Sequence, residues 1–144
     1  MSFITSTNAI KVRLENNQAL KEFCAANFSK QLKVLKAFKK KKEIGLDEFP
    51  LMLITRPQKK YISSGGASKT EHSVLLYGGF REEDAEKAFD LSIQFEELTG
   101  LAVITKTQVT GDIGMAISVE DMANDEGVFH PVYFFVMHVK VKDR

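Results

Sequence analysis

The segment 65–70, Gly-Gly-Ala-Ser-Lys-Thr, is the part of this sequence that comes nearest to a phosphate-binding loop. A P-loop runs from a strand into a helix as Gly-x-x-x-x-Gly-Lys-Ser/Thr, so that backbone amides converge on phosphate. Here Ser68 stands where the second glycine belongs, and the apolar pattern that follows predicts a strand. We therefore interpret 63–70 as a flexible polar loop between two strands and not as a nucleotide site.

The three histidines and the single cysteine lack the spacing of metal ligands or of a catalytic nucleophile. None of His72, His130 and His138 has a second ligand residue at a spacing such as i+4 on one helix. Cys24 falls on the apolar stripe of a predicted helix, where a thiol behaves as a small hydrophobic side chain. The motifs therefore predict no catalytic residue, no cofactor and no metal.

Acidic residues gather at 82–86 and again at 120–126, where we expect a turn. Asp112 and the acids at 120–126 could suggest a site for a hard cation. A calcium loop, however, needs oxygen ligands at alternating positions around a central glycine, with a final glutamate at position twelve, and these residues do not have this pattern. The acids are therefore expected to keep exposed segments solvated, or to form a surface for a partner.

Seven lysines and no acid lie between residues 30 and 42. Lysine protects an exposed edge strand from stray pairing, and a lysine-rich face also attracts acidic surfaces. The run contains one aromatic residue, Phe38, and no arginine. Because arginine is the residue that most often forms specific hydrogen bonds with bases, nucleic-acid binding is not favoured. A basic and an acidic face on one small molecule instead suggest head-to-tail contacts, which can close into rings.

Composition restricts the protein class further. The chain has 144 residues, 44% of them hydrophobic, and a net charge of +1, which fits a single folded domain over 1–144. One cysteine rules out an internal disulfide framework and suits a reducing compartment. No apolar run approaches the roughly 18 residues of a membrane span, and the first ten residues lack the pattern of a signal peptide.

Hydrophobic periodicity predicts a two-layer α+β sandwich, a mostly antiparallel sheet packed against two helices. The first helix covers about 6–28, with a possible break at Asn16-Asn17, and residues 29–42 fit either a helix or a strand. The second helix covers 82–98 and stops at Gly100, with Ala85, Phe89, Ile93 and Leu98 facing inward and Ala88 and Phe95 at the flanks of this stripe. Strands are expected at 51–55, 59–62, 73–78, 101–109, 113–119 and 132–141.

Four stretches carry a family resemblance: Phe49-Pro50 with the apolar run 51–54, the polar hairpin region 59–70 leading into 73–77, the helix 82–98, and the end of the chain at 127–129 and 132–141. In this layout the chain resembles the tail terminator proteins of long-tailed bacteriophages, including the lambda-like minor tail proteins. The resemblance favours a strand over residues 33–38.

The resemblance implies a non-enzymatic virion protein without catalytic residues. Members of that family form a homo-oligomeric ring, usually a hexamer, that caps the tail tube and joins it to the head completion proteins. It further implies a protein of the virion, present in the host cytoplasm during assembly, whose hairpin region 63–70 projects toward neighbours or the tube.

Charge and resemblance together nominate a set of contact residues. The lysine run 30–42 would face 82–86 or 120–126 of the next subunit, so reversing the charge at Lys39 and Lys40 should weaken assembly and make it more salt-sensitive. The candidate subunit or partner contacts are Lys39, Lys40, Lys59, Lys60, Tyr61, Lys69, Glu82, Glu83, Glu86, Glu120 and Asp121.

Two other protein classes stay open. The first is a small dimeric binding module, similar to secretion chaperones, that holds an extended partner in an apolar groove, although such chaperones are typically acidic. The second is a small enzyme whose site is assembled from distant residues such as Tyr61, His72 and Asp112. A deep pocket with converging polar groups would favour the enzyme.

Overall fold

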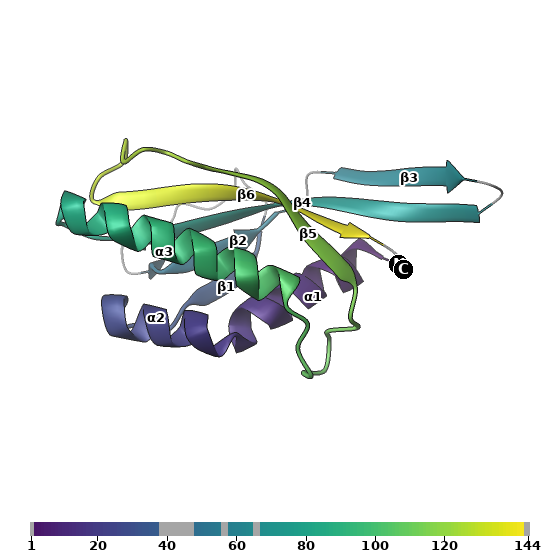
Figure 1. Ribbon diagram of the computed structural model, residues 1–144, viewed down its shortest axis with the longest axis horizontal. Coiled ribbons are helices and arrows are strands. Elements are labelled where there is room, and N and C mark those ends of the chain that lie inside the picture. The colour runs from purple at the N-terminus through teal and green to yellow at the C-terminus, as the bar shows by residue number, and fades with distance from the viewer. Residues whose placement is uncertain (1, 38–47, 56–57, 65–66, 143–144) are drawn as a thin grey trace.

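Within the described residues, three helices lie on one face of a six-stranded sheet in the computed structural model of the chain (Figure 1). The described residues are 2–37, 48–55, 58–64 and 67–142, with only the backbone described between 58 and 70. The predicted α+β sandwich is confirmed. In chain order the elements are α1 (Phe3–Asn16), α2 (Gln18–Phe28), β1 (Lys33–Lys36), β2 (Leu51–Ile54), β3 (Gln58–Ser64), β4 (Ala67–Arg81), α3 (Ala85–Ile104), β5 (Ala116–Asn124) and β6 (Val132–Lys142).

The sheet has the strand order β1-β2-β4-β6-β5, and β3 pairs with β4 outside this path. β1 and β2 are parallel, whereas the other pairs are antiparallel. β4 pairs with β6 from Glu71 to Arg81, so residues 67–70 pair only with β3 among the described strands. The hairpin of β3 and β4 therefore projects beyond the helices, as Figure 1 shows.

The core lies between the sheet and the helices. Alternate strand residues such as Met52, Leu76 and Met137 are completely buried there against the three helices. The intervening residues, among them Leu51 and Phe134, belong to a second apolar cluster on the opposite face of the sheet. This alternation is the period of two that the strand prediction used.

The break in the first helix is confirmed. Asn17 separates α1 from α2, and its side-chain oxygen accepts a hydrogen bond from the Leu20 amide at 2.9 Å, which caps α2. The expected stripe of this segment is buried, including Ile10, Leu14 and Cys24. Residues 33–36 form a strand parallel to β2, which answers the question of helix or strand for that part of 29–42, while 38–42 lie outside the described residues.

The prediction for 98–109 is wrong. Gly100 does not end α3, which continues to Ile104, and no strand forms over the described residues 101–109. Ala102 and Val103 are almost fully buried and extend the inward face of the helix by one more turn. The alternating Val and Thr residues that suggested a strand are thus divided between the end of α3 and the loop that follows it.

Two smaller predictions also need correction. The segment 63–70 is mostly strand, because β3 and β4 pair as far as Ser64 and Ala67, leaving only 65–66, outside the described residues, between them. The turn expected at 120–126 starts later, because β5 extends to Asn124, and Glu120 and Asp121 lie in the strand beside a register shift. Among the described helices, none combines the length and apolar character that a membrane span requires.

Candidate functional site

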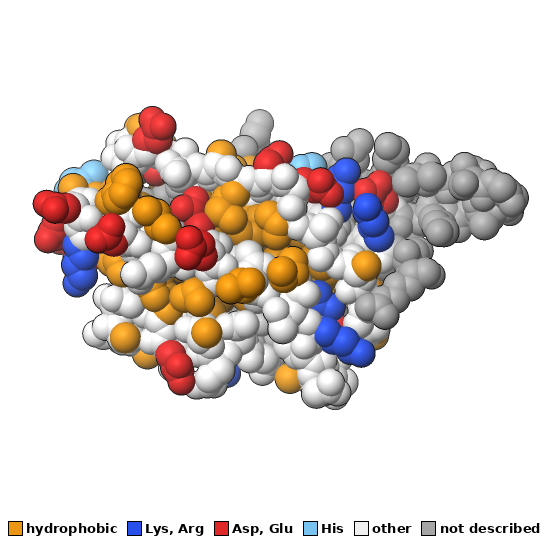
Figure 2. Space-filling model, viewed as in Figure 1, with side chains coloured by type: hydrophobic (Ala, Val, Ile, Leu, Met, Phe, Trp, Pro, Cys, Tyr) orange, Lys and Arg blue, Asp and Glu red, His pale blue; other side chains and the backbone are white. Residues whose placement is uncertain are grey.

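A groove of about 650 Å³ lies between the first half of α3 and the turn that joins β5 to β6. We call it the α3 groove. Phe89, Ile93 and Glu96 line it from the helix, and Tyr133 and Phe135 line it from β6. Figure 2 shows hydrophobic side chains along α3 and acidic side chains near the beginning of this helix.

The start of α3 is fixed by its N-cap. The Asp84 carboxylate accepts hydrogen bonds from the amides of Glu86 and Lys87, at 3.1 and 3.2 Å. This pairing satisfies two of the amides that a helix leaves free at its first turn, and it places negative charge at the positive end of the helix dipole. The cap therefore fixes the residue at which α3 begins. Packing of the buried α3 residues against the sheet determines which face of the helix points inward.

This orientation of α3 turns Phe89 and Ile93 outward. Leu91 and Phe95 are buried against the sheet, whereas Phe89 and Ile93 are 67% and 42% exposed. The predicted inward stripe is therefore wrong for Ala85, Phe89 and Ile93, whereas Leu98 packs at the edge of the core. Ala88 and Phe95, which were predicted at the flanks of the stripe, are fully buried. α3 carries two apolar stripes, and the one that continues through Ala102 and Val103 fits the sheet.

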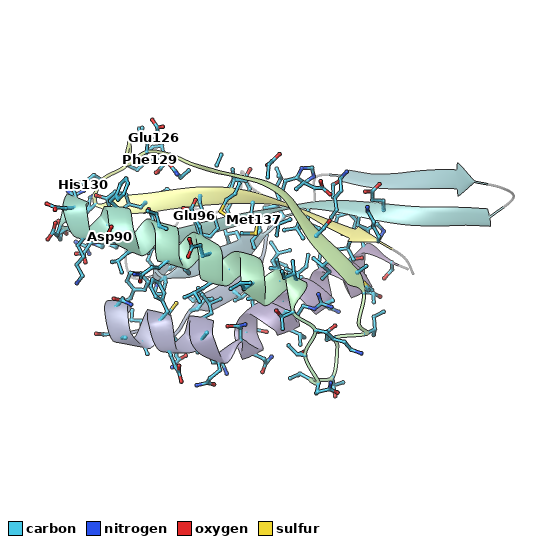
Figure 3. The ribbon with its side chains drawn as sticks, viewed as in Figure 1. Asp90, Glu96, Glu126, Phe129, His130 and Met137 are labelled. Atoms are coloured by element: carbon cyan, nitrogen blue, oxygen red, sulfur yellow. The ribbon has the colours of Figure 1, made fainter. Side chains whose placement is uncertain are left out.

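The turn between β5 and β6 is held by Asp125. Its carboxylate accepts hydrogen bonds from the amides of Gly127 and Phe134, at 3.0 and 3.3 Å. Glu126 and Gly127 both adopt left-handed backbone conformations, with φ of 55° and 78°. The compact turn brings Glu126 and His130 to the end of the groove, and Figure 3 shows both residues on this turn, with Asp90 and Glu96 on the neighbouring α3.

Tyr133 forms the polar part of the groove wall. Its hydroxyl shares a hydrogen bond with His130 Nδ1, and its ring stacks on Phe80 with 5.4 Å between ring centroids. Burial, together with the nearby carboxylates of Asp125 and Glu82, raises the pKa of Tyr133. The phenol therefore stays protonated at neutral pH and serves as a hydrogen-bonding group.

Acidic side chains, and no lysine or arginine, are among the described residues that line the groove: Glu96 from α3, and Asp125 and Glu126 from the turn. The five acids of residues 81–90 lie outside this lining, and the two bases of that segment are paired, Arg81 with Glu83 at 2.9 Å and Lys87 with Glu82 at 3.3 Å. Burial also raises the pKa of Glu96 inside the groove. A cationic partner with apolar side chains would complement this surface.

The predicted acidic contacts divide into two groups. Glu82, Glu83 and Glu86 lie at the start of α3 but do not line the groove, and Glu82 and Glu83 line a separate pocket with Lys30. Glu120 and Asp121 lie instead on the edge strand β5, where the Glu120 carboxylate is 4.0 Å from Lys140 Nζ. Sequence reasoning missed Glu96, His130 and Tyr133, because their proximity depends on how α3 lies across β6.

The predicted basic contacts lie elsewhere. Lys59, Lys60 and Tyr61 belong to β3 and Lys69 to β4, within the projecting hairpin, while Lys39 and Lys40 lie outside the described residues. Because Arg81 pairs with Val132 at one end of β4 and Glu71 with Lys142 near the other, the hairpin and the groove occupy opposite ends of the sheet. These contact assignments remain predictions.

His72 and Asp112, which sequence reasoning retained as enzyme candidates, occupy two separate buried sites. His72 Nδ1 hydrogen-bonds with Ser6 Oγ at 2.5 Å, whereas Asp112 forms an ion pair with Arg13 at 2.9 Å. Ser6 and Arg13 are two turns apart on α1, a rise of about 10 Å. The side chain of Tyr61 is not described. Among the described residues, no three His, Cys, Asp or Glu side chains are grouped as metal ligands.

Asp112 is the centre of a structural network. Burial alone would raise the pKa of Asp112, but hydrogen bonds from Arg13, Thr107 and Gly114 and the Arg13 charge hold it well below its usual range. Arg13 also donates to the carbonyls of Val103 and Met115, at 2.8 and 3.0 Å. The network fastens the connection between α3 and β5 to helix α1.

Comparison with known proteins gives a likeness in structure but none in sequence. No protein-family model matches this chain, and no curated protein matches it. Among solved structures, a chain of the virion of a native gene transfer agent particle superposes with a TM-score of 0.55 and covers 98% of both chains. The two sequences are 7% identical, so the likeness shows a shared fold.

Proposed function

We propose that this chain is a structural protein of a phage-like virion. The observation that carries the proposal is the match to a chain of a gene transfer agent virion, which extends over 98% of both chains. A match over this share of both chains involves more than a common sheet motif. The sequence resemblance to tail terminator proteins points to the same class of protein.

Within that class, we propose the role of a tail terminator, a homo-oligomeric ring that caps the tail tube and joins it to the head completion proteins. The exposed apolar stripe of α3 supports a role in assembly. A helix that is apolar on both faces is normally covered on both, and Phe89 and Ile93 are uncovered in the single chain. Such a protein would act in the virion, after assembly in the host cytoplasm, and would have no catalytic activity.

The test is the mass of the purified chain, measured by light scattering over a concentration series, with negative-stain images of the most concentrated sample. We expect a closed ring of about six subunits. A chain that stays monomeric is then incubated with isolated tail tubes and sedimented, and we expect it to sediment with them. Failure both to form a ring and to bind tubes would refute the proposal.

The α3 groove also fits a second function, the small dimeric chaperone-like module. An apolar groove of about 650 Å³ on a two-layer α+β domain is a suitable surface for an extended peptide. A tight dimer whose mass does not change with concentration, and which does not bind tail tubes, would favour this function over the ring.

A further inference from the structure

Two features of the fold lack a partner among the residues that the structure describes. One is the β3–β4 hairpin, whose outer part pairs with no other strand among those described. A two-stranded ribbon is only marginally stable in water unless something packs against it. The other is the α3 groove, with its exposed Phe89 and Ile93. Each feature needs a surface to cover it.

The two features are complementary in charge. Residues 58–70 contain three lysines and no acid, and they also contain the apolar pair Tyr61-Ile62. The groove is lined by apolar side chains and by the acids Glu96, Asp125 and Glu126, with no lysine or arginine among its described lining residues. A cationic ribbon with apolar residues therefore matches the groove in both its charge and its apolar character.

The lysine run fits the groove less well. Lys30, at its beginning, lines a pocket of about 360 Å³ together with Glu82 and Glu83 of the same chain. This part of the run is therefore already beside the acids at the start of α3. The hairpin is at the opposite end of the sheet from the groove, and so it can meet the acids that line the groove only in another molecule.

We propose that the β3–β4 hairpin of one copy lies in the α3 groove of the next copy. The contact joins opposite ends of the molecule, so it is heterologous, and repetition of such a contact closes into a ring when the rotation permits. The inference rests on the proposed function, a ring of identical subunits, and names the two surfaces that form the contact between neighbouring subunits.

Disulfide trapping tests the contact directly. Ser63→Cys and Ser64→Cys, adjacent positions whose side chains leave a strand on opposite faces, are each mixed with a Phe89→Cys chain and oxidised. We expect one of the mixtures to give a crosslinked dimer, and neither variant to crosslink with itself. The native Cys24 is buried, with its pKa raised to about 12, so it does not compete.

The matched control is Leu101→Cys. Leu101 is 57% exposed on the same helix but does not line the groove, and twelve residues place it about 18 Å from Phe89. Equal crosslinking to Leu101→Cys would overturn the inference. A ring that forms without any crosslink to Phe89→Cys would also overturn it, while leaving the proposed function intact.

Charge reversal gives a second, independent measurement. Glu126→Lys in the groove and Lys60→Glu in the hairpin should each raise the concentration needed for assembly by about tenfold, and the two together in one chain should restore it. Glu97→Lys makes the same charge change at an exposed position of α3 outside the groove, and should have little effect. Absence of rescue by the double variant would contradict the pairing.

Discussion

Arg13 and Asp112 show how much structure depends on single residues in this chain. Both side chains are almost fully buried, and the guanidinium holds the Asp112 carboxylate and two backbone carbonyls at once. Sequence reasoning identified Asp112 only as one member of a possible distant site. A buried ion pair between residues 99 positions apart leaves no local pattern in the sequence.

We predict that Arg13→Met lowers the free energy of unfolding by about 3–5 kcal/mol, because it leaves a buried carboxylate without its partner. Urea unfolding at neutral pH measures the change. Lys11→Met, which also removes a positive charge from α1 but is only partly buried, should change stability by less than about 0.5 kcal/mol. Equal effects of the two substitutions would contradict the structural role of the ion pair.

The pH dependence of stability follows from the same pair. The pKa of Asp112 is lower in the folded chain than the value of about 3.9 expected when it is unfolded. Its contribution to stability is therefore complete above the unfolded pKa and is lost as the pH falls through that value toward the folded one. Asp112→Asn should be less stable at pH 7, and its stability should fall less steeply than the wild type between about pH 5 and pH 2.

Cys24 is a residue whose predicted role the structure supports. It lies in the core, and burial raises the pKa of its thiol to about 12. Because the thiolate is the reactive form, labelling of the folded chain at pH 8 should be at least about 100-fold slower than labelling in urea. Rapid labelling of the folded chain would show that the core around α2 opens readily.

At the scale of elements, the strands were easier to predict than the length of α3. The run 132–141 is rich in β-branched and aromatic residues, and it forms β6 with the expected alternation of burial. The end of α3 was not predictable in this way. Its last turn contains Val103 and Ile104, which favour strands locally but are placed here by the burial of Val103 against the core.

Gly100 and Gly78 show that the effect of replacing a glycine by alanine depends on the packing around it. Gly100 lies inside α3, and a Cβ there would meet only Met137 Cε at 3.9 Å, so Gly100→Ala should stabilise the protein by about 0.5–1 kcal/mol. Gly78 lies in β4, where a Cβ would be 2.3 Å from the Phe135 ring, so Gly78→Ala should destabilise it by about 1–3 kcal/mol. Urea unfolding midpoints compare the two variants, and loss of stability in Gly100→Ala would contradict the continuous helix.

For the whole molecule, sequence reasoning found the charged ends but not the groove between α3 and β6. The acids at 82–86 were nominated from their charge and the lysines at 59–60 from the family resemblance, and the structure places the two groups at opposite ends of the sheet. The groove depends on which apolar stripe of α3 faces inward. Both stripes have suitable residues, and the choice is made by the shape of the sheet, which no local pattern contains.

The exposed stripe leads to a prediction about assembly and not about folding. Phe89→Ser removes an apolar side chain that is 67% exposed, so the free energy of unfolding of the single chain should change by less than about 0.5 kcal/mol. If the ring covers this side chain, the substitution should weaken assembly by a factor on the order of 10–100, the equivalent of about 1.5–3 kcal/mol. Leu101→Ser, at a similarly exposed position outside the groove, is the control.

The salt dependence of assembly distinguishes the contribution of the apolar Phe89 side chain from that of the charged side chains. Added salt shortens the screening length from about 10 Å at 0.1 M to about 3 Å at 1 M, and so weakens contacts between exposed charges. Apolar burial is not screened. The ratio of wild-type to Phe89→Ser assembly affinity should therefore stay constant as salt is raised, whereas the effect of Glu126→Lys should diminish. Light scattering at several salt concentrations measures both. If Phe89→Ser assembled as well as the wild type at every salt concentration, the exposed face of α3 would not be part of the contact between copies.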